Sequence, residues 1–341
     1  MSQQLLTLPI SPTTRTIQKS MMAGPSTMKV LITGGCGQVG SHVAEILLAR
    51  GDEVLAIDDL TTGRREHLPA SAKGLTYVNG SIADKALIDR LFAEFKPNVV
   101  VHTAASYKDP DDWYSDALTN VVGGANLVQA AKTNTVDRFI YFQTALCYGV
   151  KPLEQPITLA HPKFPANSSY AISKTASEDY LEISGLDYVI FRLANVIGPR
   201  NVSGPLPIFY SRLRDGKKCF VTEARRDFVY VGDLARTVIK AVDGQGRGPY
   251  HFSTGKDIAI KELYDAVVEG MKINDYPHAE IRPLGPDDAR TILLDPSKTF
   301  KDFGEVKFTP LSTFIPQAIE YYKEHGVFGE YTHLRLDDKK K

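Results

Sequence analysis

Two spacings of hydrophobic residues alternate along most of the chain. Short runs rich in β-branched and aromatic residues predict strands, whereas apolar residues three and four positions apart predict helices. The predicted strands are Lys29–Thr33, Glu53–Asp58, Leu75–Val78, Asn98–Thr103, Arg138–Phe142 and Asp187–Leu193. The helices predicted between them are Val39–Arg50, Lys85–Phe95, Tyr114–Lys132 and Tyr170–Ile183. This alternation predicts an α/β fold in which parallel strands form a doubly wound sheet with helices on both faces.

The pattern becomes irregular in the second half of the chain. Residues 198–230 combine prolines, glycines and arginines with little periodicity. A further strand is predicted at Pro249–Gly255, and helices are predicted near Ile260–Met271 and Thr313–Glu324. We therefore expect a smaller C-terminal lobe beside the sheet, with ligands bound in the cleft beyond the carboxyl ends of the strands.

The expected domain boundaries follow from these two patterns. We assign residues 28–197 and 227–255 to the sheet domain, and residues 198–226 and 256–329 to the smaller lobe. Residues 1–27 contain no acidic residue and three prolines, so a disordered leader is expected there. A transit peptide is the alternative, which the prolines disfavour because they interrupt any amphipathic helix. Residues 330–341 are expected to form a solvated tail.

Composition narrows the class of partner. The chain has 40 basic and 40 acidic residues, so its formal net charge is zero, which argues against nucleic acid or an anionic membrane as the main partner. The three cysteines are widely spaced and match neither a zinc site nor a disulfide framework. We therefore predict no metal site and a cytoplasmic location. No apolar run approaches the roughly 18 residues of a membrane span.

The stretch Met28–Gly40, MKVLITGGCGQVG, joins the first predicted strand to the first predicted helix. Gly34, Gly37 and Gly40 have the spacing of a dinucleotide-binding turn, in which glycine permits close approach of the backbone to a pyrophosphate. The helix N-terminus adds free N–H groups and a positive dipole end. Asp58 ends the second strand about 20 residues later, where a carboxylate binds ribose hydroxyls and repels a 2′-phosphate. The predicted cofactor is therefore NAD rather than NADP.

Candidate catalytic residues lie near the later strands. Thr144 follows the fifth strand, and Tyr170 and Lys174 open the next predicted helix. Because Tyr170 and Lys174 are four residues apart, they share a helix face. An ammonium group beside a phenol favours the phenolate, as does an oxidised nicotinamide, so we expect the pKa of Tyr170 to be lowered. Tyr170 would then act as a base near neutral pH.

Several motifs together resemble one known family. They are TGGCGQVGSH, HTAA, TALCYG, SYAISK and RLANVIGPR. The chain from Met28 to about Glu324 resembles the extended short-chain dehydrogenase/reductases, within them the NAD-dependent epimerase/dehydratase family. It looks most like the nucleotide-sugar epimerases of bacterial surface-polysaccharide clusters. The resemblance implies a Rossmann-type NAD-binding domain and a smaller lobe that binds a nucleotide-diphosphate sugar.

The family's residue roles are implied at matching positions. Tyr170 would be the catalytic base, Lys174 its partner and a ribose ligand, and Thr144 the hydroxyl that orients the sugar oxygen. The implied cofactor contacts are Gly34, Gly37, Gln38, Val39, Gly40, Asp58, Ser81, Ile82, Ala104, Asn120, Tyr170 and Lys174. The implied substrate contacts are Thr144, Asn195, Arg226 and Arg290, with Arg282 as the alternative to Arg290.

The residues after Thr144 bear on the type of reaction. Related sugar dehydratases typically carry an Asp-Glu pair there, whereas Ala145 and Leu146 supply no second acid or base for elimination. We therefore expect C4 epimerisation of a UDP-hexose, of the glucose, N-acetylglucosamine or glucuronate type, through a transient 4-keto intermediate. The alternatives are a nucleotide-sugar dehydratase, a net reductase and a non-catalytic NAD-sensing module.

The resemblance also implies an assembly and a region of sugar specificity. The helices Tyr114–Lys132 and Tyr170–Ile183 would pair with those of a second copy in a homodimer. The residues that face the sugar 2-substituent would lie around Thr291–Leu293. A uronic acid would be accepted equally well if Arg192 or Arg200 pointed into the pocket.

Overall fold

The computed structural model describes residues 27–107, 109–165, 168–274, 278–285 and 289–327. Most of the expected leader and the whole expected tail lie outside these residues. Within them, seven parallel strands form one sheet in the order β11-β6-β5-β4-β1-β2-β3. The strands are β1 (Lys29–Thr33), β2 (Glu53–Asp58), β3 (Leu75–Asn79), β4 (Val99–His102), β5 (Arg138–Thr144), β6 (Tyr188–Leu193) and β11 (Gly248–Phe252). The predicted doubly wound sheet is therefore confirmed.

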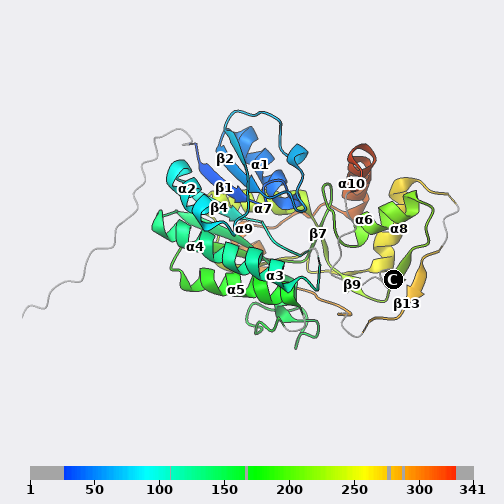
Figure 1. Ribbon diagram of the computed structural model, residues 1–341. Helices are drawn as coiled ribbons and strands as arrows, with labels where there is room; N and C mark the ends of the chain where they lie inside the picture. Colours follow the sequence, from blue (N-terminus) through cyan, green and yellow to red (C-terminus); the bar gives the residue numbers. More distant parts are fainter. Residues whose placement is uncertain (1–26, 108, 166–167, 275–277, 286–288, 328–341) are drawn as a thin grey trace, which may run out of the picture.

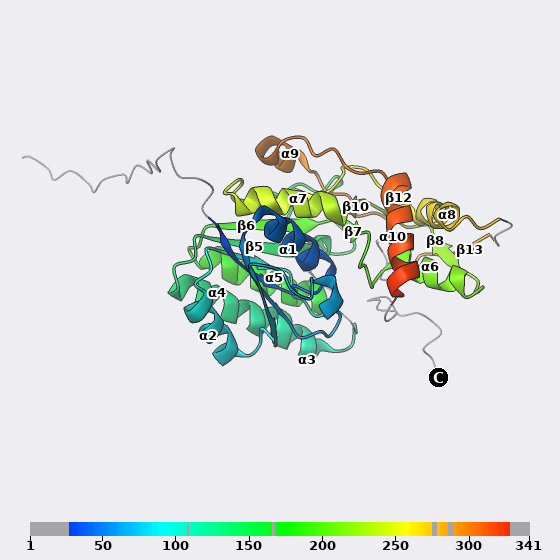
Figure 2. The same ribbon diagram turned by 90° about the horizontal axis from the view of Figure 1, so that it is seen from above.

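Helices cover both faces of this sheet (Figures 1 and 2). Alternate residues of β1 point to opposite faces, so Val30 and Ile32 belong to one core cluster and Leu31 belongs to the other. The first cluster packs against α1 (Gln38–Arg50), α7 (Val231–Val242) and α9 (Ser297–Phe303). The second packs against α2 (Lys85–Phe95), α4 (Gly124–Thr133) and α5 (Ser169–Ile183). The strands that lead to the glycine turn, Asp58 and Thr144 are thus packed on both faces by buried side chains.

The helix predicted at Tyr114–Lys132 is not regular along its length. It consists of α3 (Trp113–Asp116), a π-helical segment (Ala117–Gly123) and α4. Asn120 is buried in the π-helical segment. Hydrophobic spacing does not reveal such a segment, because π-helical turns are rare insertions within α-helices, frequently at functional sites.

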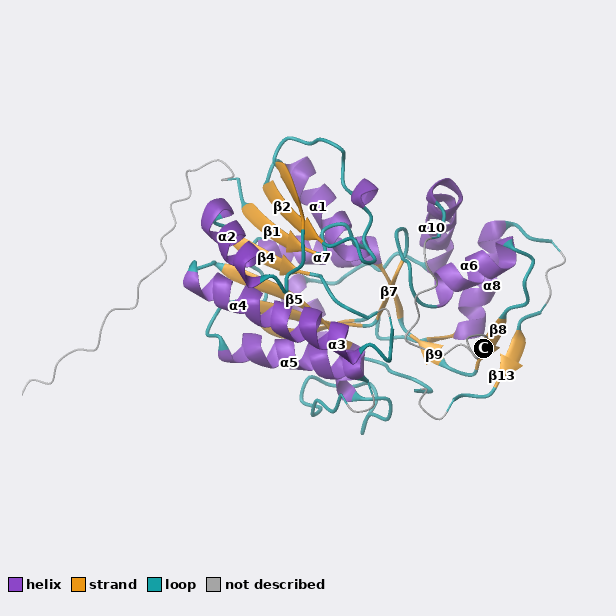
Figure 3. Ribbon diagram, in the orientation of Figure 1, coloured by secondary structure: helices purple, strands orange, loops and turns teal. Residues whose placement is uncertain are grey.

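A smaller lobe lies beside the sheet (Figure 1). Its core joins α6 (Pro205–Arg214), α8 (Ile260–Met271) and α10 (Leu311–His325). Its strands are short (Figure 3): β8 (Phe220–Thr222) pairs with β13 (Glu280–Arg282), and β9 (Arg225–Arg226) pairs with β12 (Ile258–Ala259). The sequence did not predict α6 because two prolines lie in its first turn, where the missing N–H groups are tolerated.

Three features connect the lobe to the sheet. The pair β7 (Asn195–Ile197) and β10 (Phe228–Tyr230) lies between them (Figure 2). The imidazole of His67 contacts the carbonyl oxygen of Cys36 (2.7 Å) and the hydroxyl of Tyr321 (2.6 Å), which joins the glycine turn to α10. In addition, α9 falls within residues 256–329 but packs on β11, and its Phe303 belongs to the core of the sheet.

The described helices are all too short or too polar to cross a membrane.

Candidate active site

The turn between β1 and α1 requires glycine at two positions. Gly34 has a φ of 65°, and a Cβ atom there would lie 2.7 Å from the backbone nitrogen of Ala104. A Cβ atom on Gly40 would collide with the carbonyl oxygen of Gly34. Gly37 precedes α1, and its N–H donates to that same oxygen at 3.0 Å. The turn therefore presents bare backbone at a helix N-terminus, which fits the pyrophosphate of a dinucleotide.

Asp58 lies at the end of β2, beneath this turn. Its carboxylate accepts hydrogen bonds from the N–H groups of Cys36 (2.9 Å) and Leu60 (2.8 Å). Burial raises the pKa of Asp58 above its ordinary value, and the two backbone donors oppose that shift. Each oxygen retains a lone pair for a ribose hydroxyl, so the position fits the adenosine ribose of NAD.

Asn120 orders the loop that follows β4. Its side-chain oxygen accepts from the N–H of Ser106 (2.8 Å), and its NH₂ group donates to the Ser106 carbonyl (2.9 Å) and to Ser173 Oγ (2.9 Å). The amide therefore ties the segment after Ala104 to α5. Since Ser173 lies next to Lys174, this asparagine joins the expected cofactor loop to the expected catalytic helix.

The remaining expected cofactor residues line the same end of the sheet. Ser81 and the buried Ile82 follow β3, and the Ile82 carbonyl accepts from Asn126 Nδ2 at 3.1 Å. Val39 is in the first turn of α1. Gln38 Nε2 donates to the carbonyl of Pro199 at 3.3 Å, so this side chain turns toward the smaller lobe.

Thr144, Tyr170 and Lys174 are held by the packing of α5 on β5. Thr144 ends β5, and its Oγ1 accepts from the N–H of Leu146 at 3.1 Å. Tyr170 lies in the first turn of α5. Lys174 follows one turn later and is buried, with its Nζ 4.2 Å from the centre of the Tyr141 ring. The Tyr141 hydroxyl also donates to the Lys174 carbonyl at 2.9 Å, which fixes the helix on the strand.

The pKa values of this pair differ from the sequence-based expectation. The pKa of Tyr170 is raised well above its ordinary value by burial, and the neighbouring Tyr107 and Asp116 add to the shift. Burial also lowers the pKa of Lys174 to about 7, against the opposing charge of Glu178. The expected lowering of the Tyr170 pKa is therefore wrong for the protein alone, because desolvation disfavours both charged forms.

The expected diphosphate ligands gather where β7 and β9 meet the lobe. Asn195 Nδ2 donates to the Asp227 carbonyl at 3.2 Å. Arg226 Nη1 donates to the Ala289 carbonyl at 2.8 Å and lies 3.5 Å from the Arg290 carbonyl. Arg282, by contrast, lies on β13, where it contacts Glu280 at 3.0 Å. Of the two arginines left open by the sequence, Arg290 is thus the neighbour of Arg226.

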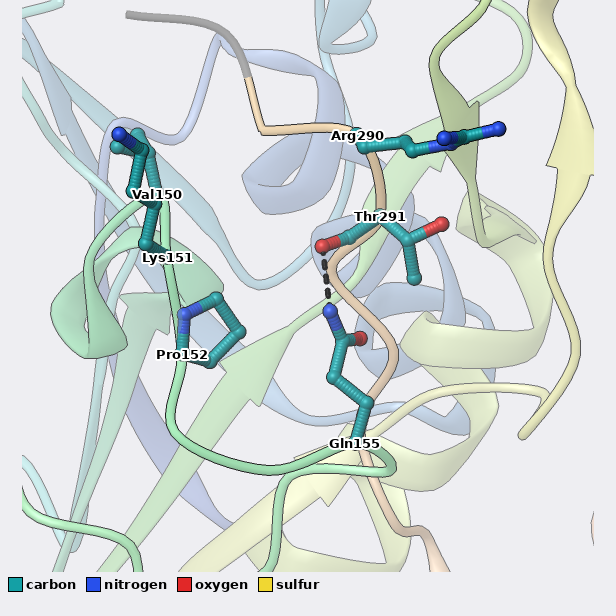
Figure 4. A pocket seen from close by; sticks show the side chains of 6 residues that line it. All are labelled: Val150, Lys151, Pro152, Gln155, Arg290 and Thr291. Carbon is teal, nitrogen blue, oxygen red and sulfur yellow. Dashed lines mark hydrogen bonds between the residues drawn. The ribbon is translucent and has the colours of Figure 1, made fainter.

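A pocket of about 370 Å³ lies beside these residues (Figure 4). It is formed between the segment after β5 and the segment after residue 288. The Gln155 amide donates to the Thr291 carbonyl at 2.7 Å and joins the two segments. The lining residues are Val150, Lys151, Pro152, Gln155, Arg290 and Thr291. The sequence pointed to Arg290 and Thr291 but not to Lys151 or Gln155, because the contact between the two segments is long-range.

The arginines considered for recognition of a uronic acid have other partners. Arg192 is buried in an ion pair with Glu178. Arg200 donates to Ser41 Oγ at 3.1 Å and pairs with Glu45 on α1. Neither arginine is among the residues that line the pocket.

The parallel sheet, the glycine turn and the Thr–Tyr–Lys set together define a dinucleotide-dependent enzyme of the short-chain dehydrogenase/reductase type. Residues 30–255 match the model of the NAD dependent epimerase/dehydratase family, and the chain belongs to that family. The family resemblance and the predicted cofactor, NAD, are thereby confirmed.

Named relatives agree with this assignment. The chain is 32% identical to a UDP-glucose 4-epimerase of Mycolicibacterium smegmatis, over 87% of this chain and 99% of that protein. It is similar to the crystal structure of the Bordetella bronchiseptica enzyme WbmH in complex with NAD⁺, with 67% sequence identity and a TM-score of 0.87. The match covers 88% of this chain and 100% of that one. It is also similar to the structure of a UDP-glucose 4-epimerase of Thermotoga maritima with UDP-glucose, with 29% sequence identity and a TM-score of 0.80. The match covers 87% of this chain and 99% of that one.

Proposed function

We propose that this protein inverts the configuration at C4 of a UDP-hexose of the glucose or N-acetylglucosamine type. The observation that carries the proposal is the position of Thr144 at the carboxyl end of β5 and of Tyr170 and Lys174 in the first two turns of α5, which packs on β5. Two relatives that match most of the chain are UDP-glucose 4-epimerases, which supports this choice of substrate class. Biosynthesis of a surface polysaccharide is the process that the resemblance suggests.

In the proposed reaction Tyr170 takes the proton of the sugar 4-hydroxyl, and Thr144 orients that oxygen. Lys174 supplies positive charge beside the phenol and a donor for the nicotinamide ribose. Bound NAD supplies a reversible acceptor for the hydride from C4, so the same molecule serves every turnover. The positive charge of the oxidised nicotinamide offsets the raised pKa that burial gives the Tyr170 phenol.

The substrate must turn over within the site while its nucleotide stays bound. We assign the diphosphate to Asn195, Arg226 and Arg290, which lie together at the edge of the lobe. Two guanidinium groups match the charge of a diphosphate and can each bind it through two hydrogen bonds. Anchoring at this end leaves the hexose able to present either face to the catalytic residues.

Two alternatives are less well supported. A dehydratase needs a second acid–base group, but Ala145 and Leu146 follow Thr144 with apolar side chains. A non-catalytic NAD sensor needs no Thr–Tyr–Lys set, and here all three residues are present on a rigid strand and helix.

We also propose a homodimer formed through α3, the π-helical segment and α5. This face exposes large apolar side chains: Trp113, Tyr114, Val122, Ile172 and Ile183. Trp113 and Ile183 are 68% and 79% exposed, which is unfavourable unless another surface covers them. A second copy of the same helix pair would do so and would bury more than about 1,000 Å². Cytoplasmic location is proposed from the three free, buried cysteines.

A panel of UDP-sugars tests the function. The purified protein should convert a UDP-hexose into its C4 epimer without added cofactor, as read by NMR of the product. Formation of a stable 4-keto-6-deoxy sugar would show a dehydratase instead. Binding of NAD with no conversion of any UDP-sugar would favour the sensing module.

A further inference from the structure

A buried carboxylate, Glu178, lies behind the candidate catalytic residues and has no role in the steps above. It is on α5, one helical turn after Lys174, and its side chain is 0% exposed. An ionised carboxylate at such a position is costly unless it has partners of opposite charge and hydrogen-bond donors. The partners of the Glu178 carboxylate therefore show which neighbouring side chains it orients.

The first partner is Arg192 on β6, whose Nη2 donates to Glu178 Oε1. The second is Lys163, in the segment before α5, whose Nζ lies 3.3 Å from that same oxygen. The third is Gln143 on β5, whose Nε2 donates to Glu178 Oε2 at 2.8 Å. The charged partners keep the pKa of Glu178 below its ordinary value although burial alone would raise it.

The contact with Gln143 leads directly to Thr144. The side-chain oxygen of Gln143 accepts a hydrogen bond from the N–H of Thr144 at 2.8 Å. An amide side chain has one donor end and one acceptor end. Because Glu178 can only accept, it forces the NH₂ end of Gln143 toward itself and leaves the oxygen for Thr144. The carboxylate thereby sets the orientation of the amide that holds the Thr144 backbone.

A second contribution concerns the charge on Lys174. The groups that face this lysine are His102 on β4, Tyr141 on β5 and Glu178 on its own helix. Burial lowers the pKa of Lys174 to about 7, and the charge of Glu178 opposes that shift. The charged groups facing Glu178, besides Lys174, are Arg192 and Lys163, with Tyr148 and His251 beyond Arg192.

We infer that Glu178 is a positioning residue of the active site, which holds Thr144 through Gln143 and favours the ammonium form of Lys174. This role rests on the proposed epimerase function, in which both residues act on the sugar. Glu178 itself touches no reacting group. Its substitution should therefore change turnover and its pH dependence more than it changes KM.

The decisive variant is Glu178→Gln, which keeps the shape of the side chain and removes its charge. With its oxygen kept on Arg192 and Lys163, the new NH₂ group would face the NH₂ group of Gln143. The Gln143 amide then no longer has an acceptor that fixes its oxygen on the N–H of Thr144. The matched control is Glu182→Gln, because Glu182 is on the same helix and also lies 3.3 Å from Lys163 but is more exposed. Thermal unfolding of both variants shows whether each is folded.

Two measurements separate this role from a structural one. In Glu178→Gln the pKa that limits kcat/KM for the UDP-hexose at alkaline pH should be about one unit lower than in the wild type. At pH values above this pKa, kcat/KM should therefore be about tenfold lower than in the wild type. Titration of Lys174 by ¹³C-lysine NMR should show its midpoint lowered likewise. Neither should change in Glu182→Gln. An unchanged Lys174 midpoint in a folded Glu178→Gln protein overturns the inference for this lysine.

The NMR titration needs no substrate, so it reports on Glu178 even if the proposed function fails. A wild-type protein that converts no UDP-sugar refutes the proposed function, while a lowered Lys174 midpoint would still support the link between the two residues. If Glu178→Gln does not fold, Gln143→Leu tests the contact to Thr144 alone. That variant should lower kcat and leave KM and the Lys174 midpoint unchanged, and unchanged kcat in it refutes the positioning of Thr144.

Discussion

Replacement of Tyr170 by phenylalanine tests the central chemical assignment. The substitution removes one oxygen and keeps the ring, which packs edge-on against Tyr107 with 6.3 Å between ring centres. Folding and NAD binding should therefore survive. A positioned base contributes about 10²- to 10⁴-fold to a proton transfer, so turnover should fall by that factor. This loss corresponds to about 3–5 kcal/mol of transition-state stabilisation.

The assay is the rate of C4 epimer formation by NMR, at saturating UDP-hexose and with the bound NAD quantified. Tyr180→Phe is the control, because it removes a hydroxyl from an exposed position on the same helix. KM for the UDP-sugar should stay near the wild-type value, since the diphosphate is anchored elsewhere. Near-normal turnover by Tyr170→Phe would place the base elsewhere and refute the mechanism.

Three further predictions follow from individual contacts. Denaturation of the purified protein should release NAD(H), and Asp58→Ala should retain less of it because ribose and turn contacts are lost; release of NADP(H) would contradict the assignment of Asp58. Light scattering at micromolar concentration should give the mass of two chains, and Ile183→Asp should give that of one; a monomeric wild type would refute the dimer. Burial lowers the pKa of His67 from 6.5 to about 4, so the unfolded chain binds the extra proton and stability should fall as pH drops from about 6.5 toward 4. His67→Gln should flatten that loss in melting temperature, and an equal slope in variant and wild type would contradict it.

The sheet domain was predictable because its strands and helices have clear periodicities. β1, β2 and α2 have the predicted bounds, since each is a short core element with one or two buried faces. The glycine turn was also predictable, because no other residue fits its backbone at Gly34. These features depend on residues close together in the sequence.

The features that were missed depend on contacts between distant residues. The π-helical segment around Asn120 is accompanied by hydrogen bonds to Ser106 and Ser173, which no local pattern encodes. The raised pKa of Tyr170 results from burial of its phenol and from the nearby Tyr107 and Asp116, which lie more than 50 residues earlier in the chain. The sequence could have indicated the role of Glu178 in one way. A charged residue four positions after a candidate catalytic lysine predicts a paired group if the helix is buried there, since charged side chains are rarely buried without a partner.

The contact of His67 with Tyr321 has a consequence for folding during synthesis, because it joins the cofactor turn to a helix near the other end of the described residues. The two residues are 254 positions apart, and the same imidazole holds the carbonyl of Cys36 in the glycine turn. A nascent chain that ends before α10 therefore lacks one of the supports of its cofactor turn. Domains generally fold as units, and the seven-stranded sheet is complete once β11 has left the ribosome, before α10 emerges. The cofactor turn thus acquires its full set of contacts only after α10 has left the ribosome.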